Sequence, residues 1–132
     1  MAIPEQFHDL FEKETFAHFA TKMPDGTPQV TPVWVDYDAE SGHLLINTER
    51  NRRKEKNVRA DPQVGVSMVD PEDPYRFVSV RGEVVEITEE GADVHIDALA
   101  QRYFDVEEYP SRDREQYAWV VLRISTDEVA TS

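Results

Sequence analysis

Apolar residues recur at every second position over much of this chain, which is the period of half-buried β-strands. Runs with this pattern, or with short clusters of β-formers, lie at residues 15–21, 29–37, 44–48, 63–69, 77–87 and 117–124. Turn-forming residues such as Pro24, Asp25 and Gly26 separate neighbouring runs, so the first two should pair as a hairpin. The pattern therefore predicts six strands.

Two of these runs are irregular. Pro32 lies inside residues 29–37, and because proline cannot donate a ladder hydrogen bond, this strand should be an edge or should bulge. In residues 77–87 the apolar positions change parity between Val84 and Val85, close to Gly82. This change predicts a β-bulge, a feature that bends a sheet into a barrel.

Helical spacing is found in two segments that flank the predicted strands. Residues 4–13 place Phe7, Leu10 and Phe11 on one face, and residues 89–104 have apolar side chains at i, i+3, i+4 and i+7. The 132 residues suffice for one domain, so residues 1–132 are interpreted as a single unit. We expect a mainly β fold, a small barrel with flanking helices, because the regular strand–helix alternation of a parallel sheet is missing.

The charge of the chain limits its partners. A formal net charge of -13 argues against nucleic acid, whose binding requires a basic surface. It suits either a salt-rich cytoplasm or ordinary solubility through self-repulsion. No apolar run approaches the ~20 residues of a membrane span, and the first residues lack a signal pattern, so a cytoplasmic protein is expected. The absence of cysteine excludes thiolate catalysis and cysteine-ligated metals.

The cations are concentrated in one segment of this acidic chain. Six of the 14 lysines and arginines lie within ten residues: Arg50, Arg52, Arg53, Lys54, Lys56 and Arg59. The segment predicts a short helix with Asn51 as its N-cap, ended by Asp61-Pro62. Cations crowded into a first helical turn oppose the helix dipole and repel one another, and a bound phosphate would relieve both problems. The alternative is a solvated basic helix that the acidic surface neutralises.

Other catalytic signatures are missing. The chain has no G-x-G-x-x-G, phosphate-binding P-loop or G-x-S-x-G motif, and its four histidines lack metal-ligand spacing. We therefore expect no metal site and identify no catalytic side chain. Demanding chemistry would have to come from an organic cofactor.

Three segments, residues 25–35, 45–62 and 73–84, resemble the pyridoxamine-phosphate-oxidase-like split barrels, particularly their short F420-dependent (deazaflavin) branch. The resemblance covers nearly the whole chain, and residues 45–62 are its most specific part. It implies a six-stranded split β-barrel of the FMN-binding type. It also implies a homodimer that builds two cofactor sites at its interface.

The resemblance further implies which residues bind the cofactor. Arg52 and Lys54 match phosphate contacts, and Arg53 and Asn57 support the turn. Many relatives carry glycine where Asn51 stands, and asparagine tolerates the left-handed backbone that this implies. The residues that match positions beside the flavin-like ring are Thr31, Val33 and Trp34 on one strand, Asn47 and Thr48 on the opposite strand, and Tyr75 and Phe77 reaching toward the other subunit. Trp34 and Phe77 could equally be core or interface aromatics, and Thr48 could only cap the helix.

The leading hypothesis is an F420-dependent oxidoreductase that passes a hydride from reduced deazaflavin to a conjugated small-molecule acceptor. One alternative is an FMN-dependent oxidoreductase of the same fold, and another is a non-catalytic carrier of the cofactor. The chain lacks the C-terminal extension with which pyridoxamine-phosphate oxidases hold their substrate, so vitamin B6 oxidation is not expected. The loops expected to shape the acceptor pocket, residues 70–74 and 105–114, carry no signature that identifies it.

Overall fold

The computed structural model of the protein describes residues 1–110 and 118–132. Its strands are β1 (Ala17–Lys22), β2 (Pro28–Val33), β3 (Asp36–Asp38), β4 (His43–Glu49), β5 (Gln63–Asp70), β6 (Asp73–Thr88), β7 (Trp119–Ile124) and β8 (Glu128–Thr131). Its helices are η1 (Glu5–Phe11), α1 (Arg53–Ala60) and α2 (Ala92–Phe104).

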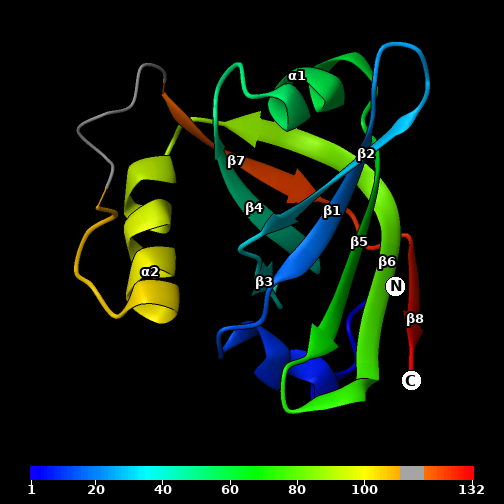
Figure 1. The fold of residues 1–132 in the computed structure, drawn as a ribbon, viewed down its shortest axis with the longest axis vertical. Helices are drawn as coiled ribbons and strands as arrows, with labels where there is room; N and C mark the ends of the chain where they lie inside the picture. The colour runs from blue at the N-terminus through cyan, green and yellow to red at the C-terminus, as the bar shows by residue number, and fades with distance from the viewer. Residues whose placement is uncertain (111–117) are drawn as a thin grey trace.

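The long strand β6 joins two antiparallel layers into one twisted sheet (Figure 1). Its first part pairs with β5 and, on the other side, with β8, whereas its last residues pair with β7. The strand order is β2-β1-β5-β6-β7-β4-β3, with β8 beside β6. The two ends of this order, β2 and β3, follow each other along the chain but are not paired within the described residues. The result is a barrel that is open between β2 and β3, and the predicted mainly β split-barrel fold is confirmed.

The described residues contain eight strands where the sequence predicts six. Residues 29–37 divide into β2 and β3 because the backbone of Val35 hydrogen-bonds to side chains of α2 instead of to a neighbouring strand. The Val35 N–H donates to Tyr103 Oη at 3.5 Å, and its carbonyl accepts from Arg102 at 3.3 Å. The second addition, β8, is four residues long, and only Val129 among them is a half-buried aliphatic side chain packed against the core.

Both predicted irregularities are present. β2, which contains Pro32, is an edge strand paired with β1. The register between β6 and β7 shifts between Val84 and Glu86, where the apolar pattern changes parity. Near this bulge a Cβ on Gly82 would lie 1.8 Å from the carbonyl oxygen of Ser125. Glycine is therefore required where β6 bends from one layer into the other.

The predicted helices form with their expected buried faces, but the first has a different geometry. η1 is a 3-10 helix, and its Phe7, Leu10 and Phe11 are buried. α2 buries the apolar stripe that its spacing predicts, including Ile96 and Leu99. No helix among the described residues is long and apolar enough to cross a membrane.

β7 is covered on both faces, which divides the interior into two layers. Val120, Leu122 and Ile124 point into the barrel core, whereas Trp119 and Val121 pack against α2. The predicted strand 117–124 begins at residue 117, which lies outside the described residues. α2 thus forms a second core on the outer side of β4 and β7, and this arrangement positions the site.

Candidate functional site

A buried carboxylate organises the basic segment at the start of α1. The side chain of Glu55 is fully buried, and its Oε1 accepts a hydrogen bond from the Asn51 N–H at 2.8 Å. Its Oε2 lies 2.6 Å from Arg59 Nε and 3.9 Å from a nitrogen of Arg50. Two of the six clustered cations, Arg50 and Arg59, are therefore paired with this buried carboxylate.

The prediction that Asn51 caps the helix is wrong. α1 begins at Arg53 with Arg52 as its N-cap, and no side chain bonds to the first turn in that role. Asn51 instead has a left-handed backbone with a φ of 70°, as the comparison with glycine-bearing relatives implied. Its Oδ1 accepts from Arg59 Nη2 at 3.0 Å, which ties the turn to the last turn of α1.

Lys54 differs from Arg53 and Lys56, the other cations of the segment that are unpaired within the described ranges, because it is partly buried. It is half-buried, and among the described residues it has neither a hydrogen-bond nor an ion-pair partner. Burial, and then the neighbouring charge of Arg52, lower the pKa of the Lys54 ammonium below its ordinary value. Arg52 is exposed and lies 3.5 Å from Glu49. A partly desolvated ammonium with no acidic partner favours an anionic ligand.

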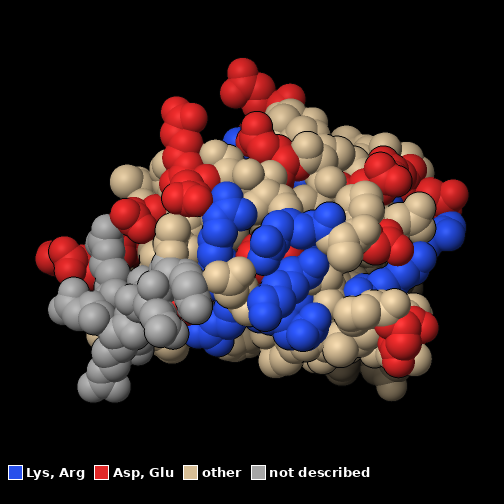
Figure 2. Space-filling model, turned by 90° about the horizontal axis from the view of Figure 1, so that it is seen from above, with Lys and Arg blue, Asp and Glu red and all other residues tan. Residues whose placement is uncertain are grey.

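The remaining cations of the segment lie on another side of α1. Arg53 and Lys56 border a separate hollow of about 280 Å³ with Lys22 and Asn57. Figure 2 views the molecule from the end at which α1 lies, and it shows lysine and arginine gathered at the centre of this end, with acidic side chains around them. The acidic chain therefore carries a positively charged end, as the sequence predicts.

A cleft of about 230 Å³ lies where the barrel is open, beside the start of α1. Both sides of the opening contribute to it, together with α2. Its lining residues are Phe16, Pro32, Val33, Trp34, Asn47, Thr48, Arg52, Lys54, Ile96, Tyr109 and Trp119. It therefore combines cations at one end with a mainly apolar, aromatic wall.

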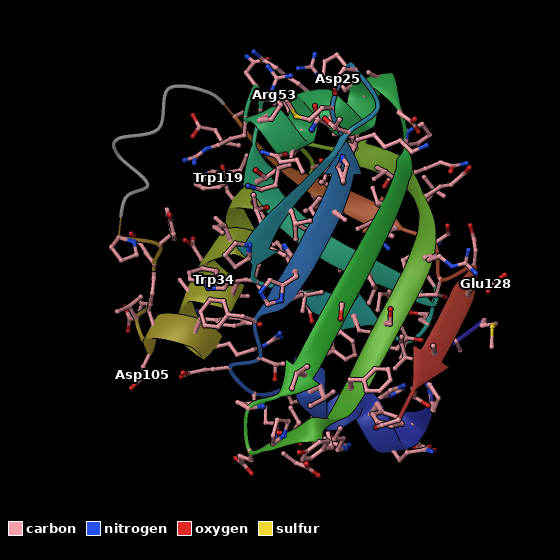
Figure 3. All side chains as sticks on the ribbon, turned by 45° about the vertical axis from the view of Figure 1, so that its right-hand side comes forward. Asp25, Trp34, Arg53, Asp105, Trp119 and Glu128 are labelled. Carbon is pink, nitrogen blue, oxygen red and sulfur yellow. The ribbon has the colours of Figure 1, made fainter. Side chains whose placement is uncertain are left out.

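Two tryptophans form that aromatic wall, on the side of the barrel that faces α2 (Figure 3). Trp34 stacks on Tyr103 with ring centroids 5.0 Å apart and an interplanar angle of 10°. Tyr109 meets Trp119 edge-on at 5.2 Å. These contacts hold the walls in fixed orientations, so the cleft suits a flat ring system.

Buried polar atoms in and near the cleft lack partners among the described residues. They are the amide oxygen of Asn47, the indole nitrogen of Trp119 and, on the adjoining strand β2, the hydroxyl of Thr31. Buried polar groups are nearly always hydrogen-bonded, and each unpaired group is costly. A ligand that carries both donors and acceptors would satisfy them.

The structure brings together six of the eleven residues that the family resemblance implies: Val33, Trp34, Asn47, Thr48, Arg52 and Lys54. Thr48 belongs to β4 and does not cap α1. Trp34 lines the cleft and also packs against the α2 core.

Five of the eleven residues do not line this cleft: Thr31, Arg53, Asn57, Tyr75 and Phe77. Asn57 is buried, and its amide donates to Thr21 Oγ1 at 3.0 Å, so it anchors α1 to β1. Tyr75, which is 86% exposed, and Phe77 lie on β6. Their expected reach toward another subunit stays a prediction.

Four residues that line the cleft were not predicted from the sequence: Trp119, Phe16, Ile96 and Tyr109. A signal for Trp119 was present, because it and Val121 alternate with the barrel-facing residues of the same strand. Of the two loops expected to shape an acceptor pocket, residues 70–74 form the β5–β6 turn beside η1, at the end opposite α1 (Figure 1). Residues 105–110 of the other loop include Tyr109, and residues 111–114 lie outside the described residues. No three His, Asp or Glu side chains within the described ranges could hold a metal ion.

The chain is similar to known proteins in both sequence and fold. Residues 3–131 match the family model described as pyridoxamine 5'-phosphate oxidase. A solved structure described as an F420 reductase is 31% identical, with 97% of this chain and 98% of that chain covered and a TM-score of 0.81. A conserved hypothetical protein from Mycobacterium tuberculosis is 26% identical over 99% of this chain and 85% of its own, with a TM-score of 0.76.

More distant structures share the fold alone. HupZ from Group A Streptococcus is 17% identical, with 98% of this chain and 93% of that chain covered and a TM-score of 0.64. No curated protein matches the chain.

Proposed function

The chain belongs to the pyridoxamine 5'-phosphate oxidase family, and from that membership we propose that it is an F420-dependent oxidoreductase acting on a conjugated small molecule. The observation that carries the proposal is the cleft that joins the uncompensated Lys54 to a wall containing two tryptophans. Likeness to a structure described as an F420 reductase over nearly the full length of both chains supports the choice of cofactor.

The basic end of the cleft would hold the cofactor phosphate. Lys54 and Arg52 supply charge, and the first N–H groups of α1 are free to donate because no side chain caps this helix. Glu55 keeps Arg50 and Arg59 away from the ligand by pairing with both. The carboxylate thus shapes the turn without cancelling the charge of Lys54.

The aromatic end fits the ring system. Trp34 and Trp119 provide flat apolar surfaces, and the unpaired polar atoms of Asn47 and Trp119 provide one acceptor and one donor. A reduced deazaflavin supplies a hydride when it is bound, so the protein needs no nucleophile or metal of its own. Its residues bind the phosphate, orient the ring and keep water from the reacting face.

A homodimer is part of the proposal, and the outer face of the sheet supports it. No helix of the described residues covers the outside of β1, β2, β5 and β6 in Figure 1. Most outward-facing positions at the centre of this face carry no lysine, arginine or acidic side chain: His18, Ala20, Val30, Pro32, Gly65, Ser67, Val69, Phe77 and Ser79. Arg81, opposite Gly65 on β6, is the charged exception beside them, and it pairs with Glu128 of β8. In a chain that is 31% charged, such a face suits contact with a second copy.

The experiment that tests the function is a titration of the purified protein with F420 and with FMN, followed by tryptophan fluorescence. We expect F420 to bind and Lys54→Met to weaken it about 10- to 100-fold, since a hydrogen bond to a charged group is lost. Unliganded Lys54→Met protein should melt no lower than wild type, because it no longer buries an unpaired charge. Lys56→Met, an exposed cation on the same helix that does not line the cleft, is the matched control.

Other outcomes would redirect the assignment. Preference for FMN would assign a flavin-dependent oxidoreductase to the same site. Tight F420 binding without hydride transfer to any quinone or conjugated carbonyl would indicate a carrier. If Lys54→Met and Lys56→Met lose affinity equally, the phosphate does not lie in the cleft.

A further inference from the structure

A chain of hydrogen bonds runs from the cleft wall through α2 to β3. The side-chain nitrogen of Asn47 on β4 lies 2.9 Å from the Ala92 carbonyl oxygen and 3.1 Å from His95 Nδ1. The other ring nitrogen of His95 lies 3.3 Å from Asp36 Oδ2. Arg102 donates to Asp36 Oδ1 at 3.2 Å. Four side chains from three elements are thus connected in series.

The groups at the two ends determine the direction of every bond. A backbone carbonyl only accepts, so the Asn47 atom facing Ala92 must be its NH₂ group. The same NH₂ group faces His95 Nδ1, which must therefore be an unprotonated acceptor. The ring proton is then on Nε2 and is donated to Asp36.

The opposite end requires the same arrangement. Arg102 has no acceptor atom, so Asp36 must accept from it. Burial raises the pKa of the Asp36 carboxyl, but the hydrogen bond with His95 and the charge of Arg102 outweigh burial and lower that pKa below its ordinary value. An ionised Asp36 accepts from both neighbours, so one proton arrangement satisfies the whole chain.

We propose that His95, held by Asp36, fixes the Asn47 amide so that its oxygen is the acceptor offered to a ligand in the cleft. With the NH₂ group engaged toward α2, the oxygen lies on the other side of the amide. It is buried without a partner among the described residues, and Asn47 lines the cleft. His95 acts here through Asn47, as a positioning residue.

The neighbouring donor defines the chemical class of that ligand. Asn47 pairs across the sheet with Val121, and Glu49 pairs with Trp119, so Asn47 and Trp119 are diagonal neighbours on one face. The indole N–H of Trp119 is buried, lines the same cleft and has no acceptor within the described part of the chain. An acceptor beside a donor is complementary to a cyclic imide or amide, which offers N–H next to C=O.

This inference rests on the proposed function, because the pyrimidinedione ring of F420, like that of FMN, has an imide edge. It assigns that edge to Asn47 and Trp119, away from the phosphate end at Lys54. It also gives His95, Asp36 and Arg102 a role that their positions outside the cleft lining would not suggest.

The first test concerns the protein without ligand. In ¹⁵N–¹H correlation spectra of the histidine side chains at neutral pH, His95 should be neutral and carry its proton on Nε2. A proton on Nδ1, or a charged ring, would overturn the hydrogen-bond arrangement.

The second test is a double-mutant cycle read as F420 dissociation constants. His95→Leu should weaken F420 binding about tenfold in the wild-type background, because the Asn47 amide is no longer held. In the Asn47→Leu background the same change should alter affinity by less than about twofold, since the group it positions is gone. His95→Asn, whose amide oxygen can replace Nδ1 as acceptor, should recover most of the affinity.

Additive effects of His95→Leu and Asn47→Leu would overturn the positioning role. If the wild-type protein binds neither F420 nor FMN, the proposed function fails and the imide assignment fails with it. The spectra of the unliganded protein decide the hydrogen-bond arrangement independently of that result.

Discussion

Asp70 accepts three charge-assisted or backbone hydrogen bonds at the end of β5 nearest η1. The Glu72 N–H, Lys13 Nζ and Arg76 Nη1 each lie 2.9 Å from its carboxylate. Arg76 also pairs with Asp9 on η1 at 2.7 Å. The backbone N–H of Glu72, then Lys13 and Arg76, hold the pKa of Asp70 far below its usual range. This residue therefore connects the N-terminal helix to the sheet.

The first prediction follows from the sign of that shift. A carboxyl whose pKa is lower in the folded state stabilises it above the unfolded pKa of about 4, and the contribution is lost as the pH falls through the folded value. Asp70→Asn should lower the melting temperature by several degrees at pH 7, and the difference from wild type should shrink steadily below pH 4. Thermal melts from pH 7 to pH 2.5 measure this. Asp127→Asn, an exposed carboxylate, is the control, and a pH-independent difference for Asp70→Asn would contradict the assignment.

At the scale of elements, β6 determines the shape of the barrel by serving both layers. Its bend coincides with Gly82, beside which the backbone of Ser125 passes. The Ser125 N–H donates to the Glu83 carbonyl at 2.9 Å, and Ser125 Oγ accepts from the Glu83 N–H at 2.9 Å. These bonds bring the end of β7 so close to β6 that a side chain at position 82 has no space.

We therefore expect Gly82→Ala to destabilise the protein by about 3 kcal/mol, at the upper end of the range for overpacking, because the contact is with backbone. Glu83→Ala introduces the same residue one position along, on the exposed face, and should change stability by no more than about 0.5 kcal/mol. Urea unfolding followed by circular dichroism measures both. Equal stability of Gly82→Ala and wild type would show that β6 and β7 can separate without cost at the bend.

At the scale of the whole molecule, charge is distributed unevenly. Acidic side chains surround the basic end at α1 on the face that Figure 2 shows. On the outer face of β1, β2, β5 and β6, most central positions carry neither acidic nor basic side chains, and Arg81 is the exception. The first feature would draw an anionic ligand toward the cleft. The second would allow two copies to meet despite a net charge of -13 on each.

The proposed dimer should have twice the chain mass of 15.2 kDa by light scattering. Ser67→Glu places a negative charge at the centre of the outer face of β1, β2, β5 and β6 and should yield monomers, because that charge would be buried at the interface. Val94→Glu adds the same charge on α2, where the side chain is 75% exposed, and should leave the mass unchanged. A wild-type monomer would exclude the dimer. A dimer that persists in Ser67→Glu would place its interface elsewhere.

Local patterns in the sequence determined much of the fold. Alternation located β1, β4, β5 and β7, the parity change located the bulge in β6, and helical spacing located the buried face of α2. The proline in β2 predicted an edge strand or a bulge, and the strand is an edge. These predictions succeed because each depends on neighbouring residues whose periodicity follows directly from backbone geometry.

Contacts between distant residues decided the rest. The strand expected at residues 29–37 divides because Arg102 and Tyr103, nearly seventy residues later, bond the backbone of Val35. Among six clustered cations, only the fold determines that Glu55 pairs with Arg50 and Arg59 while Lys54 borders the cleft unpaired. A run of like charges contains no information about which side chains a buried carboxylate will reach.

For the site, too, local sequence patterns predicted one part and contacts between distant residues decided the other. The sequence by itself located a cationic turn after a strand in a barrel of this family, and phosphate binding there is its prediction. Only the tertiary structure joined that turn to Trp119, and only it gave His95 of α2 the partners Asn47 and Asp36 from two strands. Hydrogen bonds of this kind depend on the positions of single atoms in three elements at once, and no periodicity along one chain records them.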